Sequence, residues 1–368
     1  MGFRDAATGL SRRVIVLHKE DKPLGAIARV LRRDYRVDEF DDSDVAARSA
    51  SIGHVRAVFV DMDLAVHSGL RLLRQLPRKQ YGRPPILLVG RAGDPRVSLA
   101  RTQEMADTIL EWPCPAGKLL GQVWRLLDKG IESYWLELPQ IQQEILFQTR
   151  KMLAGTVKKA TRGEEVLWET IAASSESMVQ AVDSGDMAAL LQSLKISNQL
   201  QFVHAIQVAT NMTVFGQALG FSHGDLQTLA QAGLMHDLGM NVLPQELTNK
   251  PDSLSLNERD RIRRHPLITA KLLQPIADIP PEILDVAMNH HEQLDGGGYP
   301  HGKKGMEIDN ISLICAMADA HAALTSRRPH RAALKPDDAF EMMWQQAGKR
   351  FDHAYLHRFE EVMRDLGG

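Results

Sequence analysis

The richest group of chemically reactive side chains lies between His290 and Pro300, where the sequence reads HHEQLDGGGYP. Two adjacent histidines and two carboxylates, Glu292 and Asp295, precede three glycines, an aromatic residue and a proline. Imidazole and carboxylate groups together suit first-row divalent metals such as iron, manganese, nickel and zinc. Taken alone, the stretch fits a metal site or, as the more ordinary case, a polar helix end that is followed by a loop.

Further residues of ligand type in the same half of the chain strengthen the expectation of a metal site: His204, His236, Asp237, His265 and Asp319. A single histidine more often has a core or surface role, but this set together with His290 and His291 indicates metal binding. Side chains of adjacent helical residues point about 100° apart. We therefore expect His236 and Asp237 to serve one metal only with difficulty, unless Asp237 bridges two metals.

The number of ligands is sufficient for two metals with a bridging water or hydroxide. Two ions about 3.5–4 Å apart stabilise both the attacking and the leaving oxygen of an in-line displacement at phosphorus. The set therefore predicts hydrolysis of a phosphodiester.

Helices are expected to carry these residues, because apolar side chains recur at helical spacing in every segment around them. The segments are 203–212 around His204, 226–234 before His236, 262–273 around His265, 283–288 before His290 and 311–324 around Asp319. None of them shows strand alternation over a useful length. This half of the chain is therefore predicted to be all-α.

The first third of the chain has a different pattern, in which short, continuous apolar runs alternate with helical ones. Four runs predict strands, at 14–17, 58–60, 86–89 and 108–110. Buried strands that alternate with helices are typical of a parallel α/β sheet, whose sites form at the carboxyl ends of the strands. Asp61 stands at such an end.

Residues 141–157 lie between these two parts and form an amphipathic helical pattern, with Ile145, Leu146 and Met152 in its apolar stripe. The stripe fits a dimerisation coiled coil or a helix that packs on its neighbours, and both interpretations stay open. The triplet 161–163 predicts the end of this helix, and a second helix is predicted to follow it.

The bulk composition limits the class of protein. The 368 residues suffice for two domains, and 44% hydrophobic with 24% charged residues is ordinary for globular proteins. A net charge of −2 gives no global basic field, so neither DNA nor a membrane is expected as a partner. Cys114 and Cys315 fit a reducing cytoplasm and exclude a disulfide framework. No apolar signal core is seen, and no run approaches the roughly 18 apolar residues of a membrane span.

From residue 12 to 130 the pattern resembles the receiver domain of bacterial response regulators, which implies a parallel five-stranded sheet with Asp61 as phosphoacceptor. Other positions of that family's active site differ here. Residues 18–19 are His-Lys in place of an acidic pair, Gly90 replaces a Ser or Thr, and Trp112 replaces a lysine. Phosphotransfer needs a divalent cation near the aspartate. We therefore expect a degenerate receiver that serves dimerisation or docking rather than ordinary phosphorylation.

From about His204 to Asp352 the chain resembles the HD-GYP family of HD phosphohydrolases, which hydrolyse cyclic di-GMP, and this implies such a domain over residues 191–368. Several motifs carry the resemblance in order: His236-Asp237-Leu238-Gly239, His265-Pro266, His290-His291-Glu292, Asp295 to Pro300, Ala318-Asp319 and Leu324 to Arg331. It implies an all-α HD bundle behind a helical linker over residues 131–190, which offers a dimerisation surface. A receiver-like domain in front of such a bundle also resembles bacterial signalling proteins.

The resemblance implies a role for each motif residue. Two divalent transition-metal ions (iron, manganese, nickel or zinc) would be held by His204, His236, Asp237, His265, His290, His291 and Asp319. A metal-activated hydroxide would attack phosphorus beside His236, Asp237 and His265, giving the linear dinucleotide, with GMP as a further product. Tyr299, Arg328 and Arg331 would bind substrate: the guanidinium groups of the two arginines suit phosphate oxygens, and Tyr299 would line the pocket. Alternatively, Tyr299 contacts a GGDEF-type cyclase or packs on its own turn.

Four positions depart from the family pattern. Met240 stands where the family commonly has lysine, which removes a cation from the surroundings of the substrate phosphate. Ala322, Gln207 and Leu200 replace an aspartate, an arginine and a glutamate that other members carry. These departures keep a second interpretation open, in which the chain is a weak or inactive sensor or scaffold that binds cyclic di-GMP or a cyclase.

Overall fold

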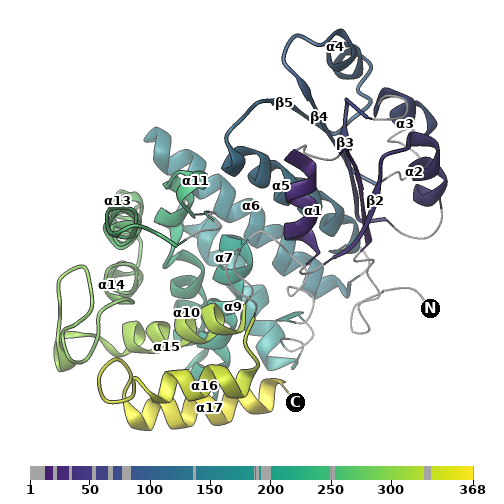
Figure 1. The fold of residues 1–368 in the computed structure, drawn as a ribbon. Coiled ribbons are helices and arrows are strands. Elements are labelled where there is room, and N and C mark those ends of the chain that lie inside the picture. Colours follow the sequence, from purple (N-terminus) through teal and green to yellow (C-terminus); the bar gives the residue numbers. More distant parts are fainter. Residues whose placement is uncertain are drawn as a thin grey trace. The chain divides into compact units, whose positions relative to one another are not determined.

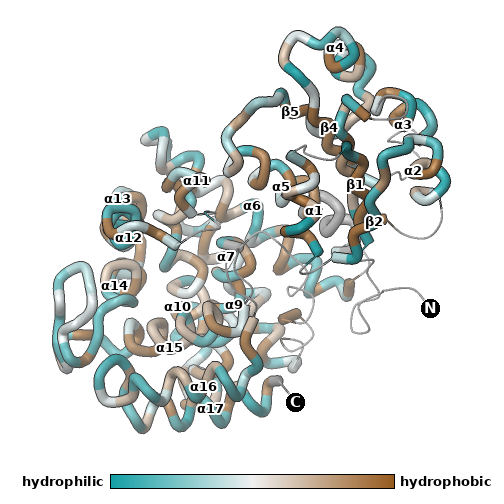
Figure 2. Tube along the Cα trace, in the orientation of Figure 1, coloured by the Kyte–Doolittle hydropathy of each residue, from teal (hydrophilic) through white to brown (hydrophobic). Residues whose placement is uncertain are grey.

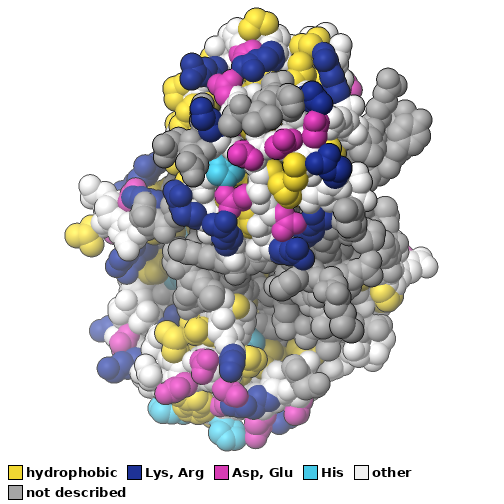
Figure 3. Space-filling model, turned by 45° about the vertical axis from the view of Figure 1, so that its right-hand side comes forward, with side chains coloured by type: hydrophobic (Ala, Val, Ile, Leu, Met, Phe, Trp, Pro, Cys, Tyr) yellow, Lys and Arg dark blue, Asp and Glu magenta, His cyan; other side chains and the backbone are white. Residues whose placement is uncertain are grey.

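Two compact units, Met1–Glu137 and Leu138–Gly368, make up the chain in this computed structural model. The structure describes residues 13–19, 23–32, 35–51, 55–64, 69–76, 84–135, 138–185, 187, 190–191, 200–248, 250, 253–326 and 333–367. No helix in these ranges is long and apolar enough to span a bilayer. On the face drawn in Figure 3, basic and acidic side chains are interspersed, in keeping with the small net charge.

The first unit is a parallel α/β sheet, as predicted (Figure 1). Its strands are β1 Arg13–Leu17, β2 Arg36–Phe40, β3 Ala57–Asp61, β4 Ile86–Arg91 and β5 Thr108–Trp112. Its helices are α1 Pro23–Leu31, α2 Ser43–Ala50, α3 Gly69–Gln75, α4 Pro95–Thr102 and α5 Ala116–Trp135. The strand order β2-β1-β3-β4-β5 is that of flavodoxin-like folds.

Two apolar layers cover the faces of this sheet. Val14 and Val16 of β1 pack with α1 and α5, whereas Ile15 and Leu17 pack with α2, α3 and α4. In Figure 2 the hydrophobic colour runs along β1 and β4, which lie inside the sheet. The edge strand β2 was not among the strands predicted from apolar runs, because its sequence, RVDEF, is mostly polar and partly exposed. Among the described strands it pairs with β1 alone.

The second unit is helical throughout its described residues, as the sequence predicts. Its α-helices are α6 Gln140–Arg162, α7 Trp168–Asp183, α9 Leu200–Ala218, α10 His223–Met235, α11 Gln245–Thr248, α12 Leu256–Ile262, α13 His265–Leu273, α14 Pro281–Asn289, α15 Asn310–Thr325, α16 Pro336–Trp344 and α17 His353–Gly367. Two short 3-10 helices, η2 Leu238–Val242 and η3 Gly305–Glu307, complete it. Helix α9 contacts both α10 and α15, so the segments that carry His204, His236 and Asp319 are neighbours.

Helix α6 buries its apolar stripe within the chain. Ile145 and Leu146 are fully buried, and Met152 is nearly so. The helix contacts α7, α9, α13 and η2, so this part of the segment predicted as a linker belongs to the second unit. Of the two interpretations of this stripe, packing on neighbouring helices is the one that the structure confirms.

Of the segment predicted as one helix over 262–273, α13 covers residues 265–273, whereas Ile262 is the last residue of the separate helix α12. Pro266 explains the division, because proline lacks an N–H and its ring clashes with the preceding turn of a helix. It is tolerated in the first turn, where α13 has it. The break puts His265 at the first position of α13 instead of inside a longer helix.

Candidate metal centre

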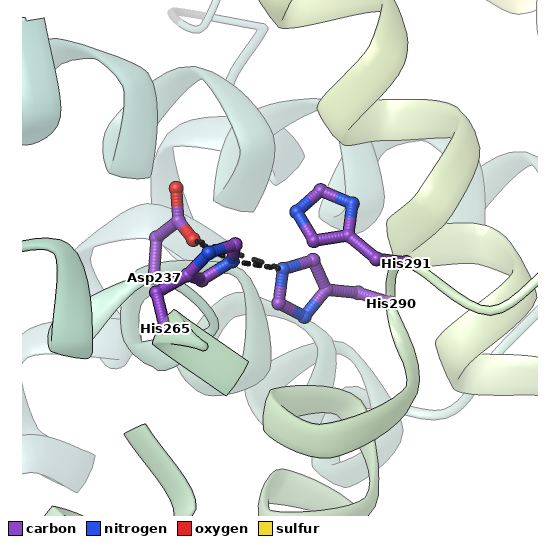
Figure 4. Close-up of side chains that lie close together, drawn as sticks. All are labelled: Asp237, His265, His290 and His291. Atoms are coloured by element: carbon purple, nitrogen blue, oxygen red, sulfur yellow. Dashed lines mark hydrogen bonds and ion pairs between the residues drawn. The ribbon is translucent and has the colours of Figure 1, made fainter. Parts of the chain in front are cut away.

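Seven side chains of ligand type meet where several helices end: His204 in α9, His236 at the end of α10, Asp237 before η2, His265 at the start of α13, His290 and His291 after α14, and Asp319 in α15. The ligand atoms form two groups, and within each group they lie within 4.8 Å of one another. One group is Asp237 with His265, His290 and His291 (Figure 4), and the other is His204 with His236 and Asp237. Asp319 Oδ1 lies 2.9 Å from His204 Nε2, which connects it to the second group.

The end of α10 brings two adjacent residues to the same place. His236 still has helical dihedral angles, but Asp237 leaves the helix with a φ of −108° and a ψ of 18°. Asp237 Oδ2 and His236 Nε2 are therefore 3.6 Å apart. The helix ends between the two residues, so Asp237 no longer follows the regular 100° spacing of helical positions.

Main-chain carbonyls set the tautomers of three histidines. The Nδ1 atoms of His236, His265 and His290 lie 2.8, 2.8 and 2.9 Å from carbonyl oxygens three or four residues earlier. A carbonyl oxygen only accepts, so each Nδ1 carries a proton and donates it. A ring held in this way has the lone pair on Nε2 when it is neutral, which is the form in which imidazole binds a metal.

The placement of these lone pairs fits a bound cation. The Nε2 atoms of His265 and His290 face each other at 3.3 Å, and Asp237 Oδ1 is 2.9 Å from the first and 3.7 Å from the second. His236 Nε2 is buried without a hydrogen-bond partner among the described residues. Lone pairs this close repel one another unless a proton or a metal ion lies between them. The donor set of imidazoles and carboxylates therefore suits a first-row divalent ion.

The pKa shifts of four candidate ligands, Asp237, Asp319, His236 and His291, favour the protonation states that bind a metal. Burial alone would raise the pKa values of Asp237 and Asp319, but the surrounding imidazoles outweigh burial and hold both well below their ordinary value. Burial lowers the pKa of His236 to about 4 and that of His291 well below its usual range. For His265, burial is outweighed by Asp237, which raises its pKa. At neutral pH, two ionised carboxylates thus lie beside the neutral imidazoles of His236 and His291.

Close packing between η2 and α13 fixes Asp237 relative to His265. The main-chain N–H of Gly239 donates to Thr269 Oγ1 at 2.9 Å, and the Thr269 hydroxyl donates to the carbonyl oxygen of His265 at 2.9 Å. A Cβ at Gly239 would lie 2.6 Å from that same carbonyl oxygen. Only glycine therefore permits this approach of the two main chains.

The glycine-rich loop is held by Glu292, whose side chain is buried. Its carboxylate accepts hydrogen bonds from the main-chain N–H of His301 at 2.7 Å and of Lys303 at 3.0 Å. Tyr299 N donates to His291 O at 3.1 Å. A Cβ at Gly298 would lie 2.5–2.6 Å from main-chain atoms of residues 291–293. These contacts fold the loop back onto the two histidines that precede it.

Tyr299 consequently lies beside the candidate ligands. Its ring centroid is 4.7 Å from that of His291 and 6.4 Å from that of His265. The Arg263 guanidinium lies 5.2 Å from the Tyr299 centroid, within cation–π range. Burial raises the pKa of the Tyr299 hydroxyl above its ordinary value, so the group stays protonated and can donate. Tyr299 therefore does more than pack on its own turn, because its ring also lies near His265 and Arg263.

The other predicted residues have different outcomes. Arg328 and Arg331 lie outside the described residues. Sequence reasoning missed two arginines near the site. Arg263 lies over the ring of Tyr299, and Arg350 Nη2 is 4.0 Å from Asp319 Oδ2. In the sequence, Arg263 stands two places before His265 and Arg350 directly precedes Phe351, and neither spacing by itself indicates proximity to the site.

Asp61 ends β3 and is buried, and its Oδ1 accepts a hydrogen bond from the main-chain N–H of Asp63 at 3.0 Å. Arginines pair with the neighbouring carboxylates. Arg96 Nη2 lies 2.6 Å from oxygens of both Asp63 and Asp94, and Arg91 Nε lies 3.4 Å from Asp63. The acidic charge next to Asp61 is thus neutralised by guanidinium groups within the protein.

The chain belongs to the HD domain family, whose sequence profile matches residues 166–355, more than half of the chain. The matched region begins just before α7, ends in α17 and contains all seven candidate ligands. It confirms the resemblance seen in the motifs at the level of this family.

Individual relatives extend the comparison. A cyclic di-GMP phosphodiesterase of Pseudomonas aeruginosa is 30% identical over 170 residues, which are 46% of this chain and only 41% of that protein. The cyclic di-GMP phosphodiesterase response regulator RpfG of Xanthomonas campestris is 26% identical over 87% of this chain and 78% of its own length, so the similarity reaches both units. The solved structure of Bd1817, an HDG"Y"P protein of Bdellovibrio bacteriovorus, shares the fold, with a TM-score of 0.50 and 18% identity over 67% of this chain and 80% of that one.

Proposed function

We propose that this chain is a metal-dependent phosphodiesterase that hydrolyses cyclic di-GMP to the linear dinucleotide, with GMP as a further product. The observation that carries the proposal is the convergence of imidazole and carboxylate groups on Asp237, where two Nε2 atoms face each other at 3.3 Å. The substrate is supported by two relatives that are named cyclic di-GMP phosphodiesterases.

We infer that the site holds two divalent ions that share Asp237. Its two carboxylate oxygens are divided between the two ligand groups: Oδ1 lies near His265 and His290, and Oδ2 near His236 and His204. A carboxylate with one oxygen in each group is suited to bridging. Iron, manganese, nickel and zinc all accept such donors, so metal analysis must identify the ion.

Bound divalent ions would activate a water nucleophile and offset the charge on the phosphate oxygens. The residues of the chain prepare the site for this chemistry. Ionised Asp237 and Asp319 supply the negative charge that holds cations, and the carbonyl-bonded histidines keep their rings oriented. The protonated Tyr299 hydroxyl provides a hydrogen-bond donor beside His291 for the dinucleotide.

The test combines metal analysis of the purified protein with nucleotide chromatography after incubation with cyclic di-GMP and manganese or ferrous iron. His236→Ala and Asp237→Asn are expected to lose bound metal and turnover while the helical content is retained. His223→Ala is the matched control, because that histidine is exposed in α10 and pairs only with Glu176 among the described residues. Unchanged turnover in the two site variants would show that the wrong residues have been assigned.

A second function, a sensor or scaffold that binds nucleotide without hydrolysing it, is favoured by one observation. Met240, in η2, leaves the position of the family lysine without charge. Bound metal without product would support the sensor. Met240→Lys then separates the two: a gain in kcat/KM of about tenfold, the size of one charge-assisted hydrogen bond, would identify a weakened enzyme.

We also propose that the glycine-rich loop contacts a partner such as a GGDEF-type cyclase. The fully exposed Met306 in η3, which follows this loop, supports an apolar contact there. A homodimer would need a surface other than the apolar stripe of α6, because the second unit itself covers that stripe.

We propose further that the first unit works without phosphorylation of Asp61. The arginine pairs of Asp63 and Asp94 support this, because a divalent cation would have to compete with Arg91 and Arg96 for their charge. Incubation with acetyl phosphate and magnesium should leave the protein unlabelled. Label that is lost in Asp61→Asn would contradict the proposal.

A further inference from the structure

Arg350 has a fixed backbone position in the loop between α16 and α17. Its main-chain N–H donates to Gln346 O at 2.9 Å, and Gly348 N donates to Phe351 O at 2.8 Å. The ring of Phe351 is 2% exposed and anchors the loop in the core. The loop therefore presents Arg350 from a fixed turn of main chain.

This loop is also joined to the glycine-rich loop. The main-chain N–H of Asp295 donates to Lys349 O at 2.9 Å, one residue before Arg350. The glycine-rich loop in turn carries Tyr299, which lies against His291. Arg350 thus belongs to the same wall of the site as residues that the sequence motifs identify.

The guanidinium of Arg350 points toward the candidate metal centre and has unused donors. Its Nη2 is 4.0 Å from Asp319 Oδ2, the outer limit of an ion pair, and its Cζ lies 4.9 Å from the Phe351 ring centroid. It forms no hydrogen bond within the described ranges, although a guanidinium carries five N–H donors. The side chain is 22% exposed, so a ligand from solvent can reach it.

Among the described residues, Asp319 is the one anion within ion-pair distance of Arg350, and it leaves most of the guanidinium donors unused. Asp319 already accepts a hydrogen bond from His204 at 2.9 Å, and its charge is shared with the neighbouring imidazoles. Metal ions at the centre would repel a guanidinium, whereas a phosphate bound to those ions would attract it. A planar fork of N–H groups matches two oxygens of a phosphate.

We propose that Arg350 binds a phosphate of the cyclic dinucleotide and supplies the positive charge that Met240 does not provide. This inference rests on the proposed phosphodiesterase function and names a binding residue of the same site. Arg263 is a less suitable candidate, because it is exposed and already lies over the ring of Tyr299.

The test compares four metal-loaded, full-length proteins: wild type, Arg350→Gln, Arg350→Lys and Lys349→Gln. Lys349 is the matched control, because it is an exposed cation of the same loop and is used through its main-chain oxygen. We expect Arg350→Gln to raise KM for cyclic di-GMP by about 10- to 100-fold, the loss of one or two charge-assisted hydrogen bonds, with metal content unchanged. Arg350→Lys should have an intermediate KM, and Lys349→Gln should stay within about twofold of wild type.

Three results would overturn the proposal: an unchanged KM in Arg350→Gln, an equal effect in Lys349→Gln, or loss of metal with the substitution, which would mean that Arg350 only orients Asp319. If Arg350→Gln does not fold, Arg350→Lys decides, because it keeps the aliphatic stem and loses only the fork. If the wild type binds but does not hydrolyse cyclic di-GMP, the enzyme proposal fails alone, and the equilibrium Kd must weaken by the same factor in Arg350→Gln. A wild type that neither binds nor hydrolyses the nucleotide overturns both.

Discussion

Gly239→Ala should uncouple the two sides of the candidate metal centre without touching a ligand. The added Cβ would lie 2.6 Å from His265 O, 2.8 Å from Thr269 N and 2.8 Å from Thr269 Oγ1. Two of these three atoms belong to the main chain, and the third is a buried hydroxyl oxygen that is hydrogen-bonded on both sides. They cannot rotate away, so η2 and α13 must separate.

The size of the shift follows from these distances. Real Cβ contacts essentially never fall below 3.0 Å, so the 2.6 Å contact requires a movement of about 0.4 Å (3.0 minus 2.6). Metal–ligand distances tolerate about 0.2 Å. We therefore expect weakened metal affinity and turnover, together with a loss of about 1–3 kcal/mol in unfolding free energy, typical of overpacking.

The assay is urea unfolding of metal-free and metal-loaded protein, combined with metal titration. Gly224→Ala is the matched control. Gly224 is in the first turn of α10 and has open space around its Cβ position. Alanine there should leave stability equal or about 0.4–1 kcal/mol higher, because it restricts the unfolded chain. If Gly239→Ala binds metal and unfolds like wild type, the close approach of η2 and α13 does not position the ligands.

Three further predictions test the supports of the site. Thr269→Val should leave the Gly239 N–H buried and unpaired, which lowers the unfolding free energy by about 1–3 kcal/mol, whereas Thr269→Ser should keep the bond; equal urea midpoints for both variants would contradict this. Glu292→Gln places an amide donor against the main-chain N–H of residue 301 or 303, so amide hydrogen exchange of residues 293–304 should become faster than in wild type. Glu282→Gln, at an exposed position, is the control and should leave the exchange rates of these residues unchanged. Removal of metal by a chelator should lower the unfolding free energy of Leu138–Gly368 by about 2.7 kcal/mol, relative to protein with free metal at a hundred times its Kd. The unfolding free energy of Met1–Glu137 should not change. If the calorimetric transition of the second unit is the same with and without metal, the ions have no structural role.

Elements with a strong local pattern were predictable from the sequence. The buried strands β1, β3 and β4 are continuous apolar runs, because helices cover both of their faces. The edge strand β2 was not predictable in this way, since its residues are exposed or only partly buried and its polar residues carry no strand signal. The break between α12 and α13 follows from Pro266, but the pattern of apolar residues continues across it.

For the site, the sequence by itself determined the chemistry: which residues can bind a metal, their order along the chain and the glycines that their surroundings require. Only the tertiary structure decided the geometry. His204 and Asp319 are 115 residues apart in sequence and 2.9 Å apart in space. His236 and Asp237 converge because the helix ends between them, and Arg350 reaches the site through a loop held by Phe351. A residue type states what a side chain can bind, whereas its distance from other side chains depends on packing between helices that the local sequence does not encode.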